Sequence, residues 1–387
     1  MNIFIISIFF FWRVFLFFVA WTGEKFLPFS PRFPYSDILL ITSHLPSWLW
    51  SFANFDGVHY LTIAKSSYSA QFTQVFFPLY PILVGIISKL FPILNLITVG
   101  LIVSNLSFFL SLEIFFKLLK LDYKKSDIKI ILLFLISFPT SFYFGSFYSE
   151  SVFLFFILCS FYLARTKRWW LSGFFGAAAS ATRLVGIFLL PALLWEWHQN
   201  EFKVKSSKYK VSNFHSLLSI FRSPITYLVP LGLIIYMLYL QINFGDFLYF
   251  WHSQPIFGAE RSGSSIILLP QVIVRYIRIL ILVDYTQEIY WIALLELLIT
   301  VFAFTALIIG HIRKVRLSYL IFSWLTVLTP TLTGTFSSMP RYVLLALPMY
   351  IVLGLIKNRL SKICILAVFI SLLLFLTVLF TRGHWVG

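Results

Sequence analysis

The fold class follows from residues 363–380, which read ICILAVFISLLLFLTVLF and contain no charged side chain. A run of this length and composition is typical of a helix that crosses a lipid bilayer. Similar stretches recur along the chain, in which 60% of the 387 residues are hydrophobic and only 11% are charged. A soluble domain cannot keep that much apolar surface out of water. We therefore predict an all-α polytopic membrane protein with one integral domain, residues 1–387.

The predicted spans follow the apolar stretches. They cover about residues 2–22, 97–116, 130–147, 151–164, 170–182, 184–197, 224–242, 289–310, 317–335, 342–356 and 363–380. Residues 76–92 and 265–283 are predicted to re-enter or lie on the membrane, and in the second stretch Arg275 and Arg278 share one helical face. The expected fold therefore has about 11 to 13 transmembrane helices. Glu296 falls inside a predicted span, so we expect a tyrosine or arginine partner for it.

The net charge of +16 comes mainly from basic residues in short loops. These loops lie around residues 117–129, 165–168, 203–222, 313–316 and 357–362. Basic loops between spans are typical of the cytoplasmic side of a membrane protein. A nucleic-acid surface is the weaker interpretation, because the loops are short and separated by spans. The loop after the first span is then extracytoplasmic.

That first loop contains Asn54-Phe55-Asp56-Gly57-Val58-His59-Tyr60, which is too polar to cross a membrane. A carboxylate at the membrane surface can meet both a lipid-borne and a water-soluble substrate, so Asp56 is a candidate general base. The alternative is that Asp56 caps a helix that begins at Gly57. Arg183 and Arg341 lie at the ends of predicted spans, where a guanidinium group can bind a lipid-borne phosphate.

Five short motifs together resemble a known family. The first is Phe55-Asp56-Gly57-Val58-His59-Tyr60-Leu61-Thr62-Ile63-Ala64, followed by Phe76-Phe77-Pro78-Leu79-Tyr80-Pro81, Tyr148-Ser149-Glu150-Ser151, Ala181-Thr182-Arg183-Leu184-Val185-Gly186 and Ser338-Met339-Pro340-Arg341-Tyr342. The first resembles the W-D-G-x-x-Y-x-x-I-A motif of PIG-V type mannosyltransferases, which belong to the GT-C superfamily of integral membrane glycosyltransferases. The others are similar in order and approximate spacing. Phe55 stands where the family usually has Trp, and Ser66-Ser67-Tyr68 replaces a small-Gly-Tyr sequence, which bears on the acceptor rather than on the fold.

The resemblance implies a GT-C-like fold whose first extracytoplasmic loop is catalytic and contains surface-lying helices. It implies transfer of a sugar, usually mannose, from a polyprenyl-phosphate carrier to a hydroxyl of a lipid-linked or protein acceptor, with inversion at the anomeric carbon. The predicted catalytic residues are Asp56 and Glu150. The predicted substrate-binding residues are Arg183, Arg341, Lys65, His59, Tyr60, Tyr80, Tyr148 and Tyr342.

Each charged candidate has a structural alternative. Glu150 could cap the helix that follows it, and Arg183 could satisfy carbonyl groups at a helix end. Arg341 and Lys65 could anchor the protein at the lipid headgroups, and for Lys65 this is the favoured interpretation. No second His or Cys accompanies His59 at metal-ligand spacing, so a metal-independent reaction is favoured and a divalent metal is the alternative.

The expected partners are a polyprenyl-phosphate-linked sugar donor, a lipid-linked or protein acceptor and membrane lipids, with no nucleic acid. The expected location is the plasma membrane of a prokaryote or the endoplasmic reticulum membrane of a eukaryote, with the active site on the extracytoplasmic side. The alternative function is a transporter or flippase of lipid-linked sugars. Such a protein would place its ionisable residues near the midplane on broken helices, often in inverted repeats. Here the acids concentrate at one predicted face, which favours the enzyme.

Overall fold

The computed structural model describes residues 2–206, 219–257, 261–262 and 265–387. Within these ranges the regular elements are helices. They are α1 (Ile3–Phe26), α2 (Ser47–Trp50), α3 (Asp56–Ser66), α4 (Leu79–Leu90), α5 (Leu96–Leu119), α6 (Lys125–Ser137), α7 (Glu150–Arg165), α8 (Trp169–Thr182), α9 (Leu189–Ser206), α11 (Pro224–Phe244), α12 (Tyr249–His252), α13 (Leu269–Leu282), α14 (Glu288–Ile312), α15 (Leu317–Thr331), α16 (Met339–Tyr342), α17 (Leu347–Gly354) and α18 (Arg359–Thr381). Most of the predicted cytoplasmic loop at residues 203–222, with Lys208 and Lys210, lies outside the described residues, as does Glu260.

Five helices are long and apolar enough to cross a membrane, namely α1, α5, α11, α14 and α18. Four of them begin at a residue whose side chain accepts a hydrogen bond from a backbone N–H of the first turn: Asn2, Asn95, Ser223 and Asn358. Such caps satisfy N–H groups that a helix leaves without partners. The all-helical membrane architecture is therefore confirmed, while the number of crossings stays a prediction.

Two predicted spans are interrupted. The span at residues 130–147 was expected to be one helix, but α6 ends at Ser137. Phe138 is extended there (φ −57°, ψ 139°) because it precedes Pro139, whose ring disfavours helical backbone at the preceding residue. The predicted span at 342–356 is likewise broken at Ala346, whose ψ of 72° is not helical. The rest of that span contains the buried helix α17. Both interruptions lie next to segments that carry site residues.

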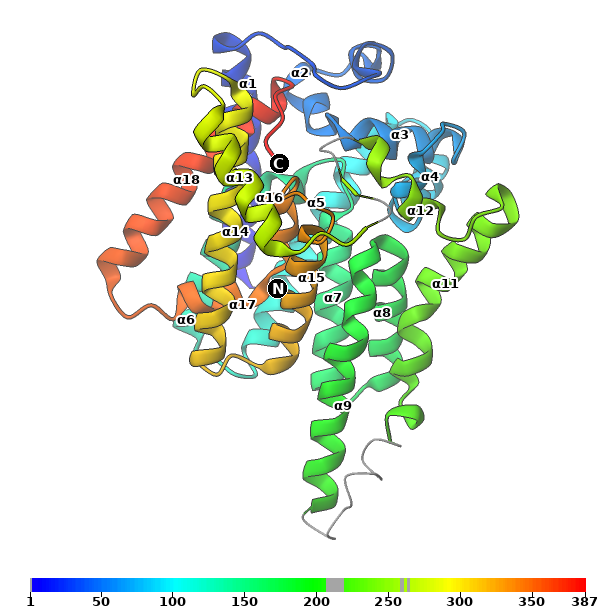
Figure 1. The fold of residues 1–387 in the computed structure, drawn as a ribbon, viewed down its shortest axis with the longest axis vertical. Helices are drawn as coiled ribbons and strands as arrows, with labels where there is room; N and C mark the ends of the chain where they lie inside the picture. The colour runs from blue at the N-terminus through cyan, green and yellow to red at the C-terminus, as the bar shows by residue number, and fades with distance from the viewer. Residues whose placement is uncertain (1, 207–218, 258–260, 263–264) are drawn as a thin grey trace.

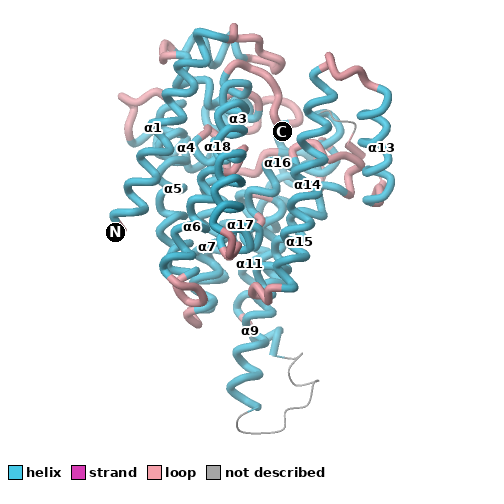
Figure 2. Tube along the Cα trace, turned by 90° about the vertical axis from the view of Figure 1, so that its left-hand side faces the viewer, coloured by secondary structure: helices cyan, strands magenta, loops and turns pink. Residues whose placement is uncertain are grey.

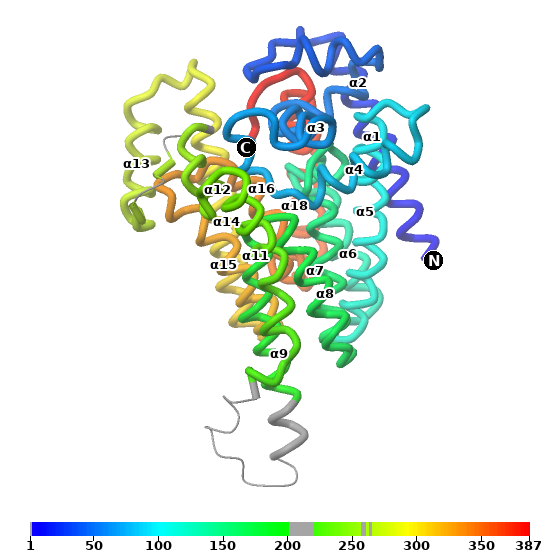
Figure 3. Tube along the Cα trace, turned by 90° about the vertical axis from the view of Figure 1, so that its right-hand side faces the viewer, coloured from blue at the N-terminus to red at the C-terminus, as the bar shows by residue number. Residues whose placement is uncertain are grey.

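The two apolar stretches set apart from the spans form short helices, α4 and α13. Each is shorter than the five long helices. Figure 3 shows α13 standing to one side of α14. These lengths agree with the prediction that neither stretch is a full single crossing, although their relation to the membrane stays a prediction.

The bundle has two distinct ends. In Figures 1 and 2 the turns that join α5 to α6 and α14 to α15, which carry basic residues, lie at the lower end. In Figure 1 the short helices α2, α3, α4 and α12 lie near the upper end. The loops assigned to opposite sides of the membrane are therefore found at opposite ends of the bundle.

Close packing of small residues joins α8 to α11. A Cβ added at Gly232 would lie 2.0 Å from the carbonyl oxygen of Ala177 and 2.6 Å from Ser180 Oγ. Ser180 Oγ also donates to the carbonyl of Val229 at 2.7 Å. Small residues let helix backbones approach in this way within membranes. The packing fixes the upper end of α8, where Arg183 follows Thr182.

Candidate active site

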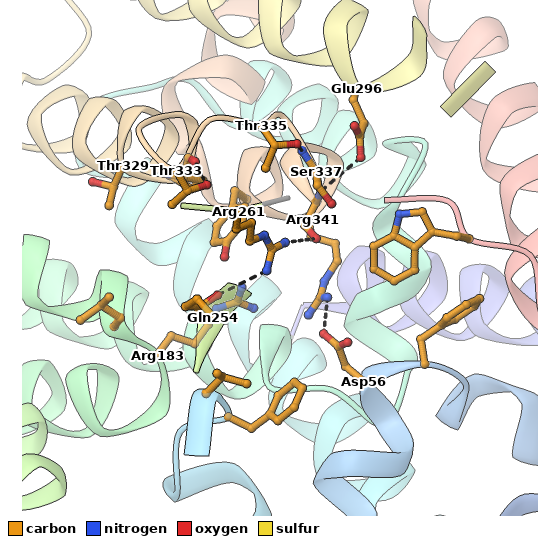
Figure 4. A pocket seen from close by; sticks show the side chains of 18 of the residues that line it. Asp56, Arg183, Gln254, Arg261, Glu296, Thr329, Thr333, Thr335, Ser337 and Arg341 are labelled. Carbon is orange, nitrogen blue, oxygen red and sulfur yellow. Dashed lines mark hydrogen bonds and ion pairs between the residues drawn. The ribbon is translucent and has the colours of Figure 1, made fainter. Parts of the chain in front are cut away.

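A cavity of about 720 Å³ opens between the upper ends of the helices and is lined by residues from α3, α12, α13, α14, α16 and the C-terminal segment 382–387. Figure 4 shows its polar wall, including Asp56, Arg183 and Arg341. The lining combines these charged groups with the rings of Phe33, Phe55 and Trp385. Such a mixed, concave site is typical of small-molecule binding.

Asp56 begins α3 and faces Arg341. Its Oδ2 lies 2.5 Å from Nη1 of Arg341, and the side chains are 22% and 6% exposed. Among the described residues, no backbone N–H donates to its carboxylate, and Oδ1 has no hydrogen-bond partner. The structure therefore favours the site role of Asp56 over the helix-cap alternative.

The backbone just before Asp56 is strained. Phe55 has φ 56° and ψ −120°, a region that residues with a side chain rarely adopt. Its ring holds this conformation by packing against Phe33, with centroids 4.6 Å apart, and edge-on against Trp385, with centroids 5.2 Å apart. Strain of this kind occurs at functional sites when the surroundings enforce it. Here it turns the first residue of α3 toward the cavity.

Glu150 begins α7 and is fully buried beneath this pair. Its Oε1 accepts from Nε and Nη2 of Arg341 at 3.0 and 2.8 Å, and it lies 2.6 Å from Nη1 of Arg183. Glu150 does not line the cavity. It joins both arginines in one network rather than capping α7. Arg183 and Arg341 likewise form ion pairs, and Arg341 is too buried to be a headgroup anchor.

Tyrosine rings surround the two guanidinium groups. The Cζ of Arg341 lies 4.8 Å from the ring centroid of Tyr148 and 5.1 Å from that of Tyr143. The Cζ of Arg183 lies 5.5 Å from the ring of Tyr342. Cations attract the faces of aromatic rings at these distances. The rings thus help to hold the arginines in place.

Six of the ten predicted site residues line the cavity: Asp56, His59, Tyr60, Arg183, Arg341 and Tyr342. Glu150 and Tyr148 lie behind them. Tyr80 packs against Tyr60, and its hydroxyl lies 3.0 Å from Ser104 Oγ. Lys65 is exposed in the last turn of α3 and is not brought to the site.

His59 lies one turn after Asp56, and its ring stacks on Phe76 with centroids 5.1 Å apart. Burial lowers the pKa of His59, and the carboxylate of Asp56 offsets part of this shift. No group of three or more His, Cys, Asp or Glu side chains that could hold a metal is found in the described ranges.

Several lining residues were not predicted from the sequence. Arg261 donates to Gln254 Oε1 at 3.3 Å and to Ser338 Oγ at 3.2 Å. Trp385 reaches the cavity from the C-terminal segment, and Trp251 of α12 also lines it. None of these residues belongs to a motif. The segment 329–338 also lines the cavity, and its Thr- and Ser-rich composition is visible in the sequence.

Glu296 was expected to need a partner inside its span, and this prediction is confirmed. Its Oε2 accepts from the hydroxyl of Tyr276 at 2.6 Å, and its Oε1 accepts from the backbone N–H of Ser338 at 3.3 Å. Glu296 is 3% exposed. It therefore supports the segment that leads to Arg341.

A family model described as Mannosyltransferase (PIG-V) matches residues 3–298. The chain belongs to the PIG-V mannosyltransferase family. The match includes Asp56, Glu150 and Arg183, while Arg341 and Trp385 lie beyond it. None of the curated proteins compared with the chain matches it. The family and the apolar helices together identify an integral membrane glycosyltransferase.

Proposed function

We propose that this mannosyltransferase takes mannose from a polyprenyl-phosphate carrier and transfers it, with inversion, to a hydroxyl of a lipid-linked or protein acceptor on the extracytoplasmic face. The observation that carries the proposal is the carboxylate of Asp56. Arg341 holds its Oδ2, while Oδ1 remains without a described partner at the edge of the cavity. A fixed carboxylate with one available oxygen is suited to accept a proton.

In the proposed reaction the acceptor hydroxyl gives its proton to Oδ1 of Asp56. The acceptor oxygen then forms a bond to the anomeric carbon of the donor sugar. The bond from that carbon to the phosphate oxygen breaks, and its electron pair leaves with the polyprenyl phosphate. Because attack and departure occur on opposite faces of the carbon, its configuration inverts. Asp56 is the catalytic residue of this scheme.

Glu150 is a positioning residue in this scheme, because it is fully buried and does not line the cavity. Removing its charge would leave two buried guanidinium groups with fewer countercharges, so we assign it the task of holding Arg183 and Arg341. Both arginines also line the cavity, where they add positive charge near the bound donor. Asp56 and Glu150 thus have guanidinium partners, which supports a reaction that needs no metal.

The extracytoplasmic placement rests on the basic loops. The described basic turns between α5 and α6 and between α14 and α15 lie at the end of the bundle opposite α3, and basic loops are typically cytoplasmic. A lipid-linked donor can reach a cavity near that membrane surface while its chain stays in the bilayer. The positions of the loops and of the cavity therefore support the same orientation.

The direct test uses purified full-length protein and a polyprenyl-phosphate-mannose labelled in the sugar. With a panel of glycolipid and peptide acceptors, we expect label to move to at least one acceptor, with inverted anomeric configuration. The same assay is run with a chelator, which should leave the rate unchanged. A known mannosyltransferase serves as the positive control for the assay. The proposed donor would be contradicted if this control were active and the protein transferred no label, or if it took the sugar from a nucleotide sugar instead.

A further inference from the structure

The positive charges of the cavity do not all have acidic partners. Arg183 and Arg341 share Glu150, Arg341 also pairs with Asp56, and Arg32 pairs with Glu288. Arg261 differs, because its hydrogen bonds go to Gln254 and Ser338, which are neutral. Within the part of the chain that the structure describes, it has no carboxylate within ion-pair distance. Arg261 is therefore a cation available for an anionic ligand.

The guanidinium of Arg261 uses only some of its hydrogen-bond donors within the described residues. One bond is made by Nη1 and one by Nη2, whereas a guanidinium carries five N–H donors in a planar fork. Figure 4 shows Arg261 pointing toward Gln254 inside the cavity, while Arg341 points toward Asp56. The remaining donors suit the oxygens of a phosphate, which guanidinium groups bind through paired hydrogen bonds.

Hydroxyl groups form the wall beside Arg261. The lining includes Thr329, Thr333, Thr335, Ser337 and Ser338, all from one short segment. The hydroxyls of Thr329 and Thr333 donate to backbone carbonyls, so their oxygens can still accept. The hydroxyl of Ser337 makes no hydrogen bond to any other described residue. A wall of this kind can bond to phosphate and to the hydroxyls of a sugar.

Among the described residues, Glu296 is the acid that must be weighed against an anion at Arg261, because the two side chains interact electrostatically. Glu296 accepts from Tyr276 and from the N–H of Ser338, one hydrogen bond on each oxygen. It forms no ion pair with Arg261 among the described contacts. Ser338 lies between them, since its N–H faces Glu296 and its Oγ faces Arg261. Arg261 thus lines the cavity without an ion pair to Glu296.

We propose that Arg261 and Ser337 bind the phosphodiester of the lipid-linked donor, in a subsite distinct from the Asp56–Glu150–Arg183–Arg341 network. This inference rests on the proposed function, which supplies the donor. The two sites are linked through α16, because Ser338 bonds to Arg261 and the N–H of Arg341 donates to the carbonyl of Ser338 at 2.9 Å. The base is therefore held at one end of α16 and the leaving phosphate at the other. The sugar lies between them.

The test measures binding of a radiolabelled polyprenyl phosphate to purified full-length protein in detergent, without any transfer step. Arg261→Gln should raise Kd by roughly 10- to 100-fold, the usual weight of hydrogen bonds to a charged group. Arg261→Lys should recover part of the loss, because it keeps the charge but not the fork. Ser337→Ala should weaken binding by a few-fold. Polyprenol, which has no phosphate, should bind the wild type and Arg261→Gln equally.

Arg278→Gln is the matched control. Arg278 is an exposed arginine on α13 that does not line this cavity, so its loss should leave Kd unchanged. If the wild type binds polyprenyl phosphate and Arg261→Gln binds it equally well, the subsite is wrong and the donor proposal stands. If the wild type does not bind it, the donor proposal fails and this inference with it. Equal competition by phosphatidylglycerol would identify a general lipid-headgroup site and would also overturn the inference.

Discussion

Replacing Asp56 with Asn separates proton transfer from structure. Asn keeps a carbonyl oxygen that can accept from Nη1 of Arg341, and Arg341 keeps its two bonds to Glu150. The change therefore removes the basic oxygen but little of the packing. General-base catalysis contributes about 100-fold or more, so turnover should fall by at least about 100-fold, or about 2.7 kcal/mol of activation free energy.

The assay measures transfer of labelled mannose at saturating donor and acceptor, so that the change reports kcat. Thermal unfolding in the same detergent and binding of polyprenyl phosphate should both remain near the wild-type values. Glu150→Gln is the contrasting variant. It removes the buried carboxylate shared by Arg183 and Arg341, and breaking such a network should cost about 3–5 kcal/mol of folding stability.

The two variants make the roles of the carboxylates distinguishable. Turnover close to wild type in Asp56→Asn would refute the general-base assignment. Equal loss of stability in both variants would show that Asp56, like Glu150, serves mainly to balance the charge of Arg341. Lost turnover with retained stability in Asp56→Asn alone is the expected pattern.

Three further predictions test orientation, titration and packing. In a Cys364→Ser background, a cysteine at exposed Lys65 should react with a membrane-impermeant thiol reagent from outside, and one at exposed Lys357 should not. Because burial lowers the folded pKa of His59 below the unfolded value of about 6.5, stability should fall as pH drops below about 6.5, and His59→Gln should reduce that fall in thermal unfolding. Gly232→Ala places a methyl 2.0 Å from an α8 carbonyl oxygen and should lower stability by about 1–3 kcal/mol in the same measurement.

The sequence was sufficient to predict the class of fold and to select the charged residues that form the acid–arginine network. Asp56 and Arg341 are 285 residues apart, yet the sequence marks both, Asp56 in the polar loop after the first span and Arg341 at the end of a predicted span. Charged side chains at such positions must find partners, because hydrocarbon offers none. This argument selects the residues but not the pairs that they form. Only the structure shows that Glu150 joins both arginines from behind.

Other features depend on contacts that no local pattern records. Lys65 lies about two and a half helical turns beyond Asp56, and the helical geometry of α3 carries it away from the cavity. Arg261 and Trp385 belong to no motif, and they reach the cavity only because distant segments meet at the upper end of the bundle. The break in α6 was readable from Pro139, which a search for apolar runs overlooks.

The arrangement of charges gives a reason for pairing a general base with an arginine. In the proposed reaction, the charges closest to the transfer are the negative charges of Asp56, Glu150 and the phosphodiester and the positive charges of Arg183, Arg261 and Arg341. As the sugar is transferred, Asp56 becomes neutral and the leaving phosphate gains a second negative charge. The total is unchanged, and the charge moves across α16 from the Asp56 end toward Arg261. An enclosed site of low dielectric stabilises a reaction of this kind best, because no net charge is created and its fixed guanidinium groups need not reorganise.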